Sequence, residues 1–247
     1  MASLITLLTD FGISDSYVAE VKGVLLTALP DATLVDVTHQ VPPGDVRAGQ
    51  YLFTRAWRRF PAGTVHLVVV DPGVGTARRA LAAQAAGHFF VAPDNGLLSS
   101  LSGDATFVSL PIPPAAAPTF HARDVFAPAA ARLALGTPLD DLGDEVSDPL
   151  RMPLPEPRLD GVAWLGEVVY IDRFGTLVSN LPAIDVEPGV RIVVEGNDVG
   201  SLRRTFGDVE PGQLVAYAGS GGDVEIAVRG GSAARLLGVG VGAEVRA

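Results

Sequence analysis

The stretch VVVDPGVGTARR, residues 68–79, joins a run of valines to a turn with one carboxylate, two glycines and two arginines. A β-branched run suits a buried strand, because its side chains pack well on a pleated surface. The DPGVG segment is typical of a tight turn, in which glycine lets the backbone approach another group closely. We therefore expect a buried strand that ends in a loop carrying both an acid and a guanidinium group.

The residues around this stretch alternate between strand-like and helix-like patterns. Strands are expected at 4–10, 32–39, 64–70 and from 89, and helices at 16–30, 45–60 and 123–136. This alternation predicts an α/β fold with a mostly parallel sheet flanked by helices. Because sites in such sheets form where strands end, Asp10, His39 and Asp71 stand at positions suited to function.

A proline-rich segment divides the chain. Four prolines fall within residues 148–161, where neither a helix nor a central strand can continue. We expect an α/β N-terminal domain at 1–147, a linker at 148–160 and a β-rich C-terminal domain at 161–247. The last part has short alternating runs between glycine-rich turns, which predicts a smaller antiparallel β-barrel or sandwich.

Composition narrows the class of protein. Of 247 residues, 48% are hydrophobic and 19% charged, which favours a folded chain over a disordered one. The net charge of −10 would repel nucleic acid and tolerate a cationic ligand. The chain has no cysteine for a disulfide or thiolate site, no signal-peptide pattern and no stretch suited to a membrane span. We therefore expect a cytoplasmic protein with no membrane or nucleic-acid partner.

The loop after residue 70 offers an acid–base set. Asp71 and Arg78 could form an ion pair that only fixes the loop. His121 precedes the start of an expected helix, where its side chain can face a cleft. If the three meet in a buried place, Arg78 would keep Asp71 ionised, and Asp71 would orient a water molecule or His121.

Two carboxylates follow the first strand. Asp10 ends it and Asp15 lies five residues later. An ionised carboxylate accepts hydrogen bonds and suits the paired hydroxyls of a ribose. It can equally cap the backbone of a turn. Similar structural roles are expected of His39, as a turn cap, and of His66, inside a strand.

A metal site is the alternative interpretation of the same edge of the sheet. Carboxylates and imidazoles at strand ends are hard or borderline ligands, as in many phosphohydrolases. The residues concerned are Asp10, Asp36, His39, Asp71, Asp94 and His121. No HxH, HExxH or DxD spacing supports this site, and the 68–79 stretch lacks the GK[ST] ending of a phosphate loop.

Seven stretches together resemble one known family, the S-adenosylmethionine hydrolases. They are TDFGISDSYVAEVKG, VDVTH, VVVDPGVGTARR, APDNGLLS, TFHARDVFAPAAA, YIDRFGTLVSN and GSGGDVEIAVRGGSAARLLG. Members of this family, also called hydroxide adenosyltransferases, are relatives of the fluorinases and chlorinases. The resemblance spans nearly the whole chain and implies cleavage of S-adenosyl-L-methionine by water to adenosine and L-methionine, with no metal or organic cofactor. It also implies a homotrimer whose sites lie between neighbouring subunits.

The resemblance assigns roles to individual residues. It implies that an Asp-Arg-His set prepares the attacking water, and the matching positions are Asp71, Arg78 and His121. The other matching positions hold the substrate: Asp10 at the ribose, Asp15 close to the substrate, Asp172 and Ser220 at the methionine end, Phe206 near the adenine, Thr176 near the nucleoside, and Glu225 in the matching strand.

Several positions separate hydrolysis from the halogenating branch. Halogenases have tyrosine where this chain has Asp71, serine where it has Ala122, and tryptophan where it has Gly44. Only residues 80–92 stand where fluorinases carry a long inserted loop. The comparison favours hydrolysis over halogenation.

One position departs from the hydrolase pattern as well. The family reads DRFGN where this chain reads DRFGT, so Thr176 replaces an amide with a hydroxyl of smaller hydrogen-bonding capacity. This departure keeps open the alternative that the protein is a module that binds S-adenosylmethionine or a nucleoside without turning it over.

The reaction itself suits an acidic protein, because the substrate carries a sulfonium cation. The attraction of this cation to an approaching anion is strongest in a dry pocket.

Overall fold

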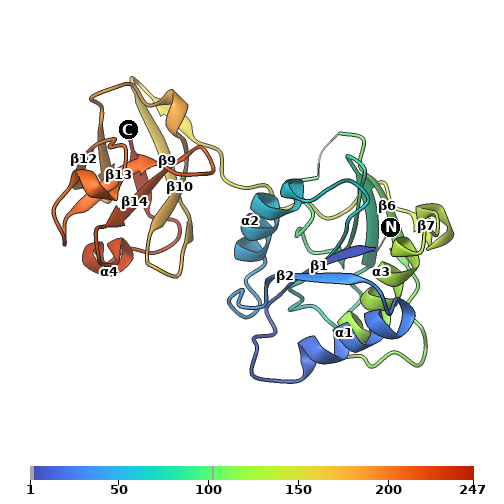
Figure 1. Cartoon of the computed structure of the whole chain (residues 1–247). Coiled ribbons are helices and arrows are strands. Elements are labelled where there is room, and N and C mark those ends of the chain that lie inside the picture. The colour runs from blue at the N-terminus through green and yellow to red at the C-terminus, as the bar shows by residue number, and fades with distance from the viewer. Residues whose placement is uncertain (1–2, 102) are drawn as a thin grey trace. The chain divides into compact units, whose positions relative to one another are not determined.

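A computed structural model describes residues 3–101 and 103–247 of the chain. The chain divides into two compact units, Met1–Pro153 and Leu154–Ala247. The boundary between them lies inside the segment 148–160 that the prolines mark as a linker. Figure 1 shows helices and strands mixed in the first unit and a strand-rich second unit. In the described ranges, no helix combines the length and apolar character needed to cross a bilayer.

The N-terminal unit contains a seven-stranded sheet with the order β2-β1-β3-β5-β4-β6-β7. Its strands are β1 (Leu4–Thr9), β2 (Thr33–Thr38), β3 (Val65–Val69), β4 (Ala80–Ala85), β5 (His88–Pro93), β6 (Thr106–Leu110) and β7 (Asp144–Glu145). Strands β2, β1, β3 and β5 are parallel, whereas β4 runs antiparallel to β5 and β6. The expectation of a mostly parallel sheet with helices is confirmed.

Helices cover both faces of this sheet. They are α1 (Tyr17–Ala28), α2 (Val46–Ala56) and α3 (Ala127–Ala134). Side chains alternate between the faces of a strand, so Ile5 and Leu67 join Val21 and Leu25 of α1 and most of α3 in one buried cluster. On the opposite face, Phe53 of α2 packs edge-on against Phe90 of β5.

A buried polar pair lies under α2. His66 Nδ1 is 2.7 Å from the hydroxyl of Thr6, and its Nε2 is 3.1 Å from Nδ1 of His88. Burial, together with the nearby charge that a protonated His88 would carry, lowers the pKa of His66 to about 3. The aromatic rings of Phe53, Trp57 and Phe90 surround the pair, which agrees with a structural role for His66.

The C-terminal unit is an antiparallel sheet that nearly closes into a barrel. Its main path runs β12-β11-β15-β9-β10-β14-β13. The strands are β8 (Arg158–Asp160), β9 (Ala163–Ile171), β10 (Leu177–Pro182), β11 (Arg191–Val194), β12 (Asn197–Ser201), β13 (Leu214–Ala218), β14 (Asp223–Val228) and β15 (Glu244–Arg246), with one helix, α4 (Ala233–Leu237). Just beyond β12, the backbone N–H of Arg203 donates to the carbonyl of Ala216 in β13, at 2.7 Å. The expectation of an antiparallel barrel or sandwich is therefore confirmed, and the observed form is a nearly closed barrel.

Candidate active site

Local hydrogen bonds and a glycine with positive φ shape the loop between β3 and β4. The hydroxyl of Thr76 donates to the carbonyl of Gly73 at 2.7 Å. Gly75 has a φ of +78°, and a Cβ placed there would lie 2.7 Å from the carbonyl oxygen of Pro118. Glycine is therefore required by conformation and by space. It lets the loop lie directly against the segment that leads to His121.

Asp71 and Arg78 form a two-point ion pair within this loop. Arg78 Nε donates to Asp71 Oδ1 at 2.9 Å, and Nη2 donates to the other carboxylate oxygen. Only 5% of the Asp71 side chain and 9% of the Arg78 side chain are exposed. Because the pair is buried, solvent screens it far less than a surface ion pair. The alternative interpretation, a weak and solvent-exposed ion pair that only fixes the loop, therefore does not describe the Asp71–Arg78 pair.

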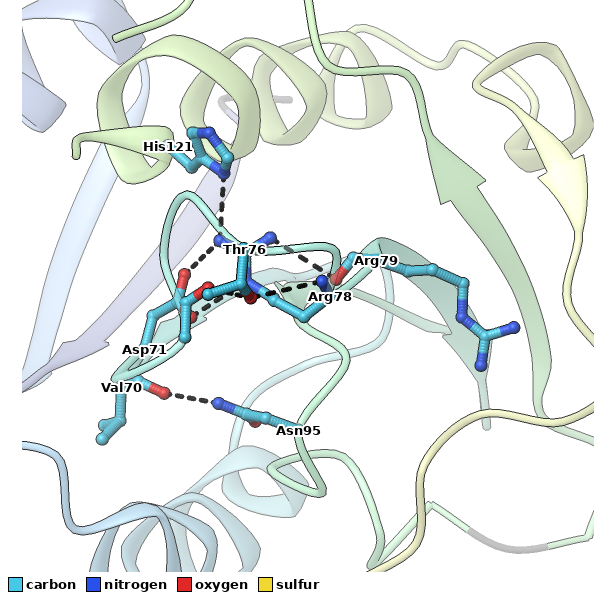
Figure 2. A network of polar contacts seen from close by, with 8 residues as sticks. Val70, Asp71, Thr76, Arg78, Arg79, Asn95 and His121 are labelled. Carbon is cyan, nitrogen blue, oxygen red and sulfur yellow. Dashed lines mark hydrogen bonds and ion pairs between the residues drawn. The ribbon is translucent and has the colours of Figure 1, made fainter. Parts of the chain in front are cut away.

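Arg78 also contacts His121, as Figure 2 shows. Its Nη2 lies 3.0 Å from Nδ1 of the buried His121 ring. The structure thus brings together all three residues of the expected acid–base set. Arg78 lies between Asp71 and His121. Within this set of three described residues, His121 therefore contacts the guanidinium of Arg78 and not the carboxylate of Asp71.

The protonation state of His121 follows from this geometry. Burial lowers the pKa of His121, and the charge of Arg78 lowers it further, while Asp71 and Asp124 oppose the change. The ring is therefore neutral at neutral pH. A guanidinium can only donate, so Nδ1 must be the acceptor and the ring proton is assigned to Nε2.

A π-turn presents His121 to the loop. The turn, Ala122–Phe126, starts directly after His121 and runs into α3. Such turns are rare and frequently occur at functional sites. Arg123 within the turn binds Asp124 and reaches Glu20 of α1 at 2.8 Å. These contacts fix the turn between α1 and α3, which sets the direction of the His121 side chain.

Asp10 lies at the same edge of the sheet. Thr9 and Val69 are paired in neighbouring parallel strands, so Asp10 and Asp71 follow adjacent strand ends. One carboxylate oxygen of Asp10 accepts the backbone N–H of Gly44 at 2.7 Å. Asp10 therefore caps a turn, as one of its two interpretations expected, while its second oxygen is compatible with the ribose role. Asp15 is exposed in the segment before α1.

Among the described residues, the candidate metal ligands do not assemble into a group of three. Asp36 forms an ion pair with Lys22 at 2.7 Å, and Asp94 forms one with Arg79 at 2.7 Å. His39 Nδ1 lies 2.8 Å from the hydroxyl of Thr9 and Nε2 lies 3.0 Å from Asp36, so its ring joins two strand ends through side-chain contacts rather than capping a turn. In the parts of the chain that the structure describes, no group of three His, Asp or Glu side chains is placed to hold a metal ion.

The C-terminal unit contains a second group of expected site residues. A pocket of about 780 Å³ is lined by all five that fall in this unit, namely Asp172, Thr176, Phe206, Ser220 and Glu225. One oxygen of Asp172 accepts the backbone N–H groups of Phe174 and Thr176, at 2.9 and 2.8 Å. The DRFGT motif is therefore a tight turn that holds Asp172 and Thr176 at the pocket.

Tyr217 is a pocket residue that the sequence analysis did not identify. Its hydroxyl donates to Glu225 Oε2 at 2.9 Å, and its ring centre lies 4.7 Å from that of Phe206. Burial and the Glu225 carboxylate raise the pKa of the Tyr217 phenol. A Cβ at Gly219 would overlap the Glu225 carboxylate, so this glycine makes room for it. A tyrosine just before the GSGG turn, opposite a strand glutamate, was the available signal.

Family comparisons cover both units. Residues 5–143 match the SAM hydroxide adenosyltransferase N-terminal domain, and residues 166–246 match the C-terminal domain of the same family. The chain is 44% identical to an (R)-S-adenosyl-L-methionine hydrolase of Salinispora tropica, over 98% of this chain and 96% of that protein. It is 46% identical to one of Thermus thermophilus, over 97% of each. A fluorinase of Nocardia brasiliensis is 32% identical, over 91% of this chain and 89% of its own.

Solved structures support the same relationship. A conserved protein of Thermotoga maritima, described as uncharacterized, superposes with a TM-score of 0.91 and 36% identity, over 98% of both chains. A conserved hypothetical protein of Thermus thermophilus superposes with a TM-score of 0.83 and 44% identity, over 100% of this chain and 99% of its own. The fold is therefore shared along the full length of the chain.

The protonation state of His121 can be measured directly. Because its pKa is lowered from the usual 6.5, the ring should be mostly neutral at pH 6.5 and should reach its titration midpoint at a lower pH. The measurement is an NMR titration of the histidine Cε1–H signals, with His121 assigned from the spectrum of His121→Gln. A His121 midpoint at or above 6.5 would contradict the assignment.

A variant of Arg78 tests the cause of the pKa shift, and a variant of Arg191 is its control. Arg78→Gln removes a repelling cation and leaves the Asp71 carboxylate, so the pKa of His121 should rise relative to the wild type. Arg191→Gln removes an arginine from an exposed pair in the other unit and should leave the His121 signal unchanged.

Proposed function

This chain belongs to the SAM hydroxide adenosyltransferase family, and we propose that it hydrolyses S-adenosyl-L-methionine to adenosine and L-methionine. The observation that carries the proposal is the buried Arg78 fork, which contacts both Asp71 and His121. The fork lies at the edge of the sheet where Asp10 also ends a strand. A charged acid, a fixed cation and a neutral imidazole are thereby gathered beside a group suited to a ribose.

The reaction is a displacement at the ribose C5′. A C5′–O bond forms to the oxygen of water, the C5′–S bond breaks, and its electron pair stays on sulfur as methionine leaves. One proton of the water must be lost. His121 has its Nδ1 engaged by Arg78 and its proton on Nε2, so in this state it donates rather than accepts. Asp71 is therefore the member of the set that can accept the proton or orient the water.

Electrostatics favour this step. The positive charge on sulfur disappears as the C5′–S bond breaks, and the attraction between this cation and the negative charge that develops on the approaching oxygen lowers the energy of the transition state. The attraction is strongest where water is excluded. Holding the oxygen and C5′ in line would supply much of the remaining acceleration. Asp71 and Arg78 are both almost fully buried, which agrees with such an environment.

The remaining residues are assigned to the substrate. Asp10 would bind the ribose hydroxyls through the oxygen that Gly44 does not occupy. Around the C-terminal pocket, Asp172 and Ser220 would hold the methionine end, and the exposed face of Phe206 would lie near the adenine. Thr176 would lie near the nucleoside, Glu225 would face the substrate from β14 in the same pocket, and Asp15 would approach the substrate from the N-terminal unit.

We assign the working form as a homotrimer, in which each site combines an N-terminal unit with the C-terminal unit of a neighbouring chain. The assignment rests on the family resemblance and on the division of the substrate-binding residues between two units. A closed ring of three identical contacts is a common way to complete a site from two chains.

The reaction is tested with Asp71→Asn, which keeps the shape of the side chain and removes its charge. We expect turnover to fall by about 10²–10⁴-fold, the scale of general acid–base catalysis, because the water loses its acceptor. Binding of S-adenosylmethionine should change much less. Chromatography of the products with and without a chelator measures turnover, and calorimetry measures binding.

A matched control exists in the other unit. Asp198 also forms a two-point pair with an arginine, Arg191, but on an exposed surface. Asp198→Asn should leave turnover unchanged. If the wild type binds S-adenosylmethionine but releases no adenosine, the protein is a binding module without turnover. If it releases phosphate from a nucleotide and a chelator stops this release, it is a phosphohydrolase. Wild-type turnover by Asp71→Asn would refute the role of Asp71.

The shared site is tested by mixing two inactive variants. Asp71→Ala damages the N-terminal half of a site, and Ser220→Ala damages the C-terminal half. In randomly mixed trimers, about a quarter of sites would combine two intact halves, so activity should return to about that fraction of the wild type. Each variant alone is the control. No recovery in trimers shown to be mixed, or an active monomer in light scattering, would contradict the shared site.

A further inference from the structure

Two consecutive side chains after β5 contact both ends of the loop between β3 and β4, which carries Asp71 and Arg78. Asn95 Nδ2 donates to the carbonyl of Val70 at 2.8 Å, directly before Asp71. Asp94 accepts Nε of Arg79 at 2.7 Å, directly after Arg78. Figure 2 shows Asn95 below the loop with its amide directed at Val70. One turn therefore binds the neighbours of both members of the ion pair.

The turn itself is held firmly. Gly96 has a φ of +96°, and a Cβ there would lie 2.6 Å from that of Met152. The amide oxygen of Asn95 accepts the backbone N–H of Leu97 at 3.3 Å. The second oxygen of Asp94 accepts the backbone N–H of Leu150 at 2.7 Å. The side chains of Asn95 and Asp94 thus start from a fixed backbone.

The bond to Val70 acts on the direction of Asp71. Val70 is fully buried and lies one residue beyond the end of β3, so its carbonyl needs a donor from outside the sheet. That carbonyl belongs to the peptide plane that includes the N–H of Asp71. Fixing the plane limits the rotation that aims the Asp71 carboxylate at Arg78.

We propose that Asn95 is a positioning residue for the hydrolytic reaction, acting through the Val70–Asp71 peptide, with Asp94 securing the other end of the loop through Arg79. The proposal rests on the proposed function, because it gives Asp71 a role in the chemistry. A side-chain amide suits the task because it donates to Val70 and accepts from its own turn at the same time.

Asn95→Asp is the most selective variant. It keeps an oxygen for the N–H of Leu97 and removes the donor to Val70. Asn95→Ser is a second, uncharged variant whose side chain is too short to reach. For both we expect kcat to fall by about 10–100-fold, the scale of a misplaced catalytic group, while the dissociation constant for S-adenosylmethionine stays within about threefold.

Ser99→Ala is the matched control. The Ser99 hydroxyl accepts the N–H of Met152 at 2.8 Å and donates to the carbonyl of Gly96 at 2.7 Å, so it supports the same turn without contacting the loop. This variant should lower the melting temperature and leave kcat unchanged. Equal losses of kcat in Ser99→Ala and the Asn95 variants would overturn the proposal, as would a failure of both Asn95 variants to fold.

A double-mutant cycle separates positioning from general support. If Asn95 acts through Asp71, adding Asn95→Ser to Asp71→Asn should lower the single-turnover rate no further. A full additional loss in the double variant would overturn the proposal. The cycle also tests the two claims separately. Wild-type turnover by Asp71→Asn alone would refute the role of Asp71 in the proposed reaction. Impaired turnover by Asp71→Asn, with a full further loss on adding Asn95→Ser, would refute only the positioning role of Asn95.

Discussion

The guanidinium of Arg78 is the group on which the acid–base set of the N-terminal unit depends, because it binds the two oxygens of Asp71 and the Nδ1 of His121 at once. Removing one partner of a buried ion pair costs about 3–5 kcal/mol, since the other charge is left uncompensated. The surrounding structure serves this contact. Gly75 lets the loop approach Pro118, and the π-turn after residue 121 delivers the imidazole to the same guanidinium.

The chemistry proposed for the site uses charges that the fold has already buried. Asp71 and Arg78 neutralise each other in the resting protein, so the carboxylate can be kept away from water without an isolated buried charge. A neutral His121 beside Arg78 avoids a second cation. In the second unit, Asp172 and Glu225 line a pocket whose carboxylates suit the cationic groups of the substrate.

The sequence predicted the parallel strands and their helices because these have clear hydrophobic periods, as the valines of β3 and the amphipathic α2 show. It did not predict β4, whose residues ALAAQA are mostly alanine and have little β-propensity. Residue chemistry placed Asp71 and Arg78 in one loop and suggested an acid–base set with His121, and the family resemblance made this role specific. The roles of Asp172 and Ser220 came from the resemblance alone. The contact of Asn95 was not predicted, because only tertiary packing brings its amide to Val70, 25 residues away. The contact of Tyr217 with Glu225 depends on the pairing register of the β13–β14 hairpin, which the sequence analysis did not assign.

The most direct measurement of the central claim is the fate of the oxygen atom. The wild-type enzyme is given S-adenosylmethionine in oxygen-18 water, and both products are analysed by mass spectrometry. Attack of water at C5′ places one oxygen-18 atom in the 5′-hydroxyl of adenosine and none in methionine. Label in methionine, or adenosine without label, would contradict displacement at C5′ by water.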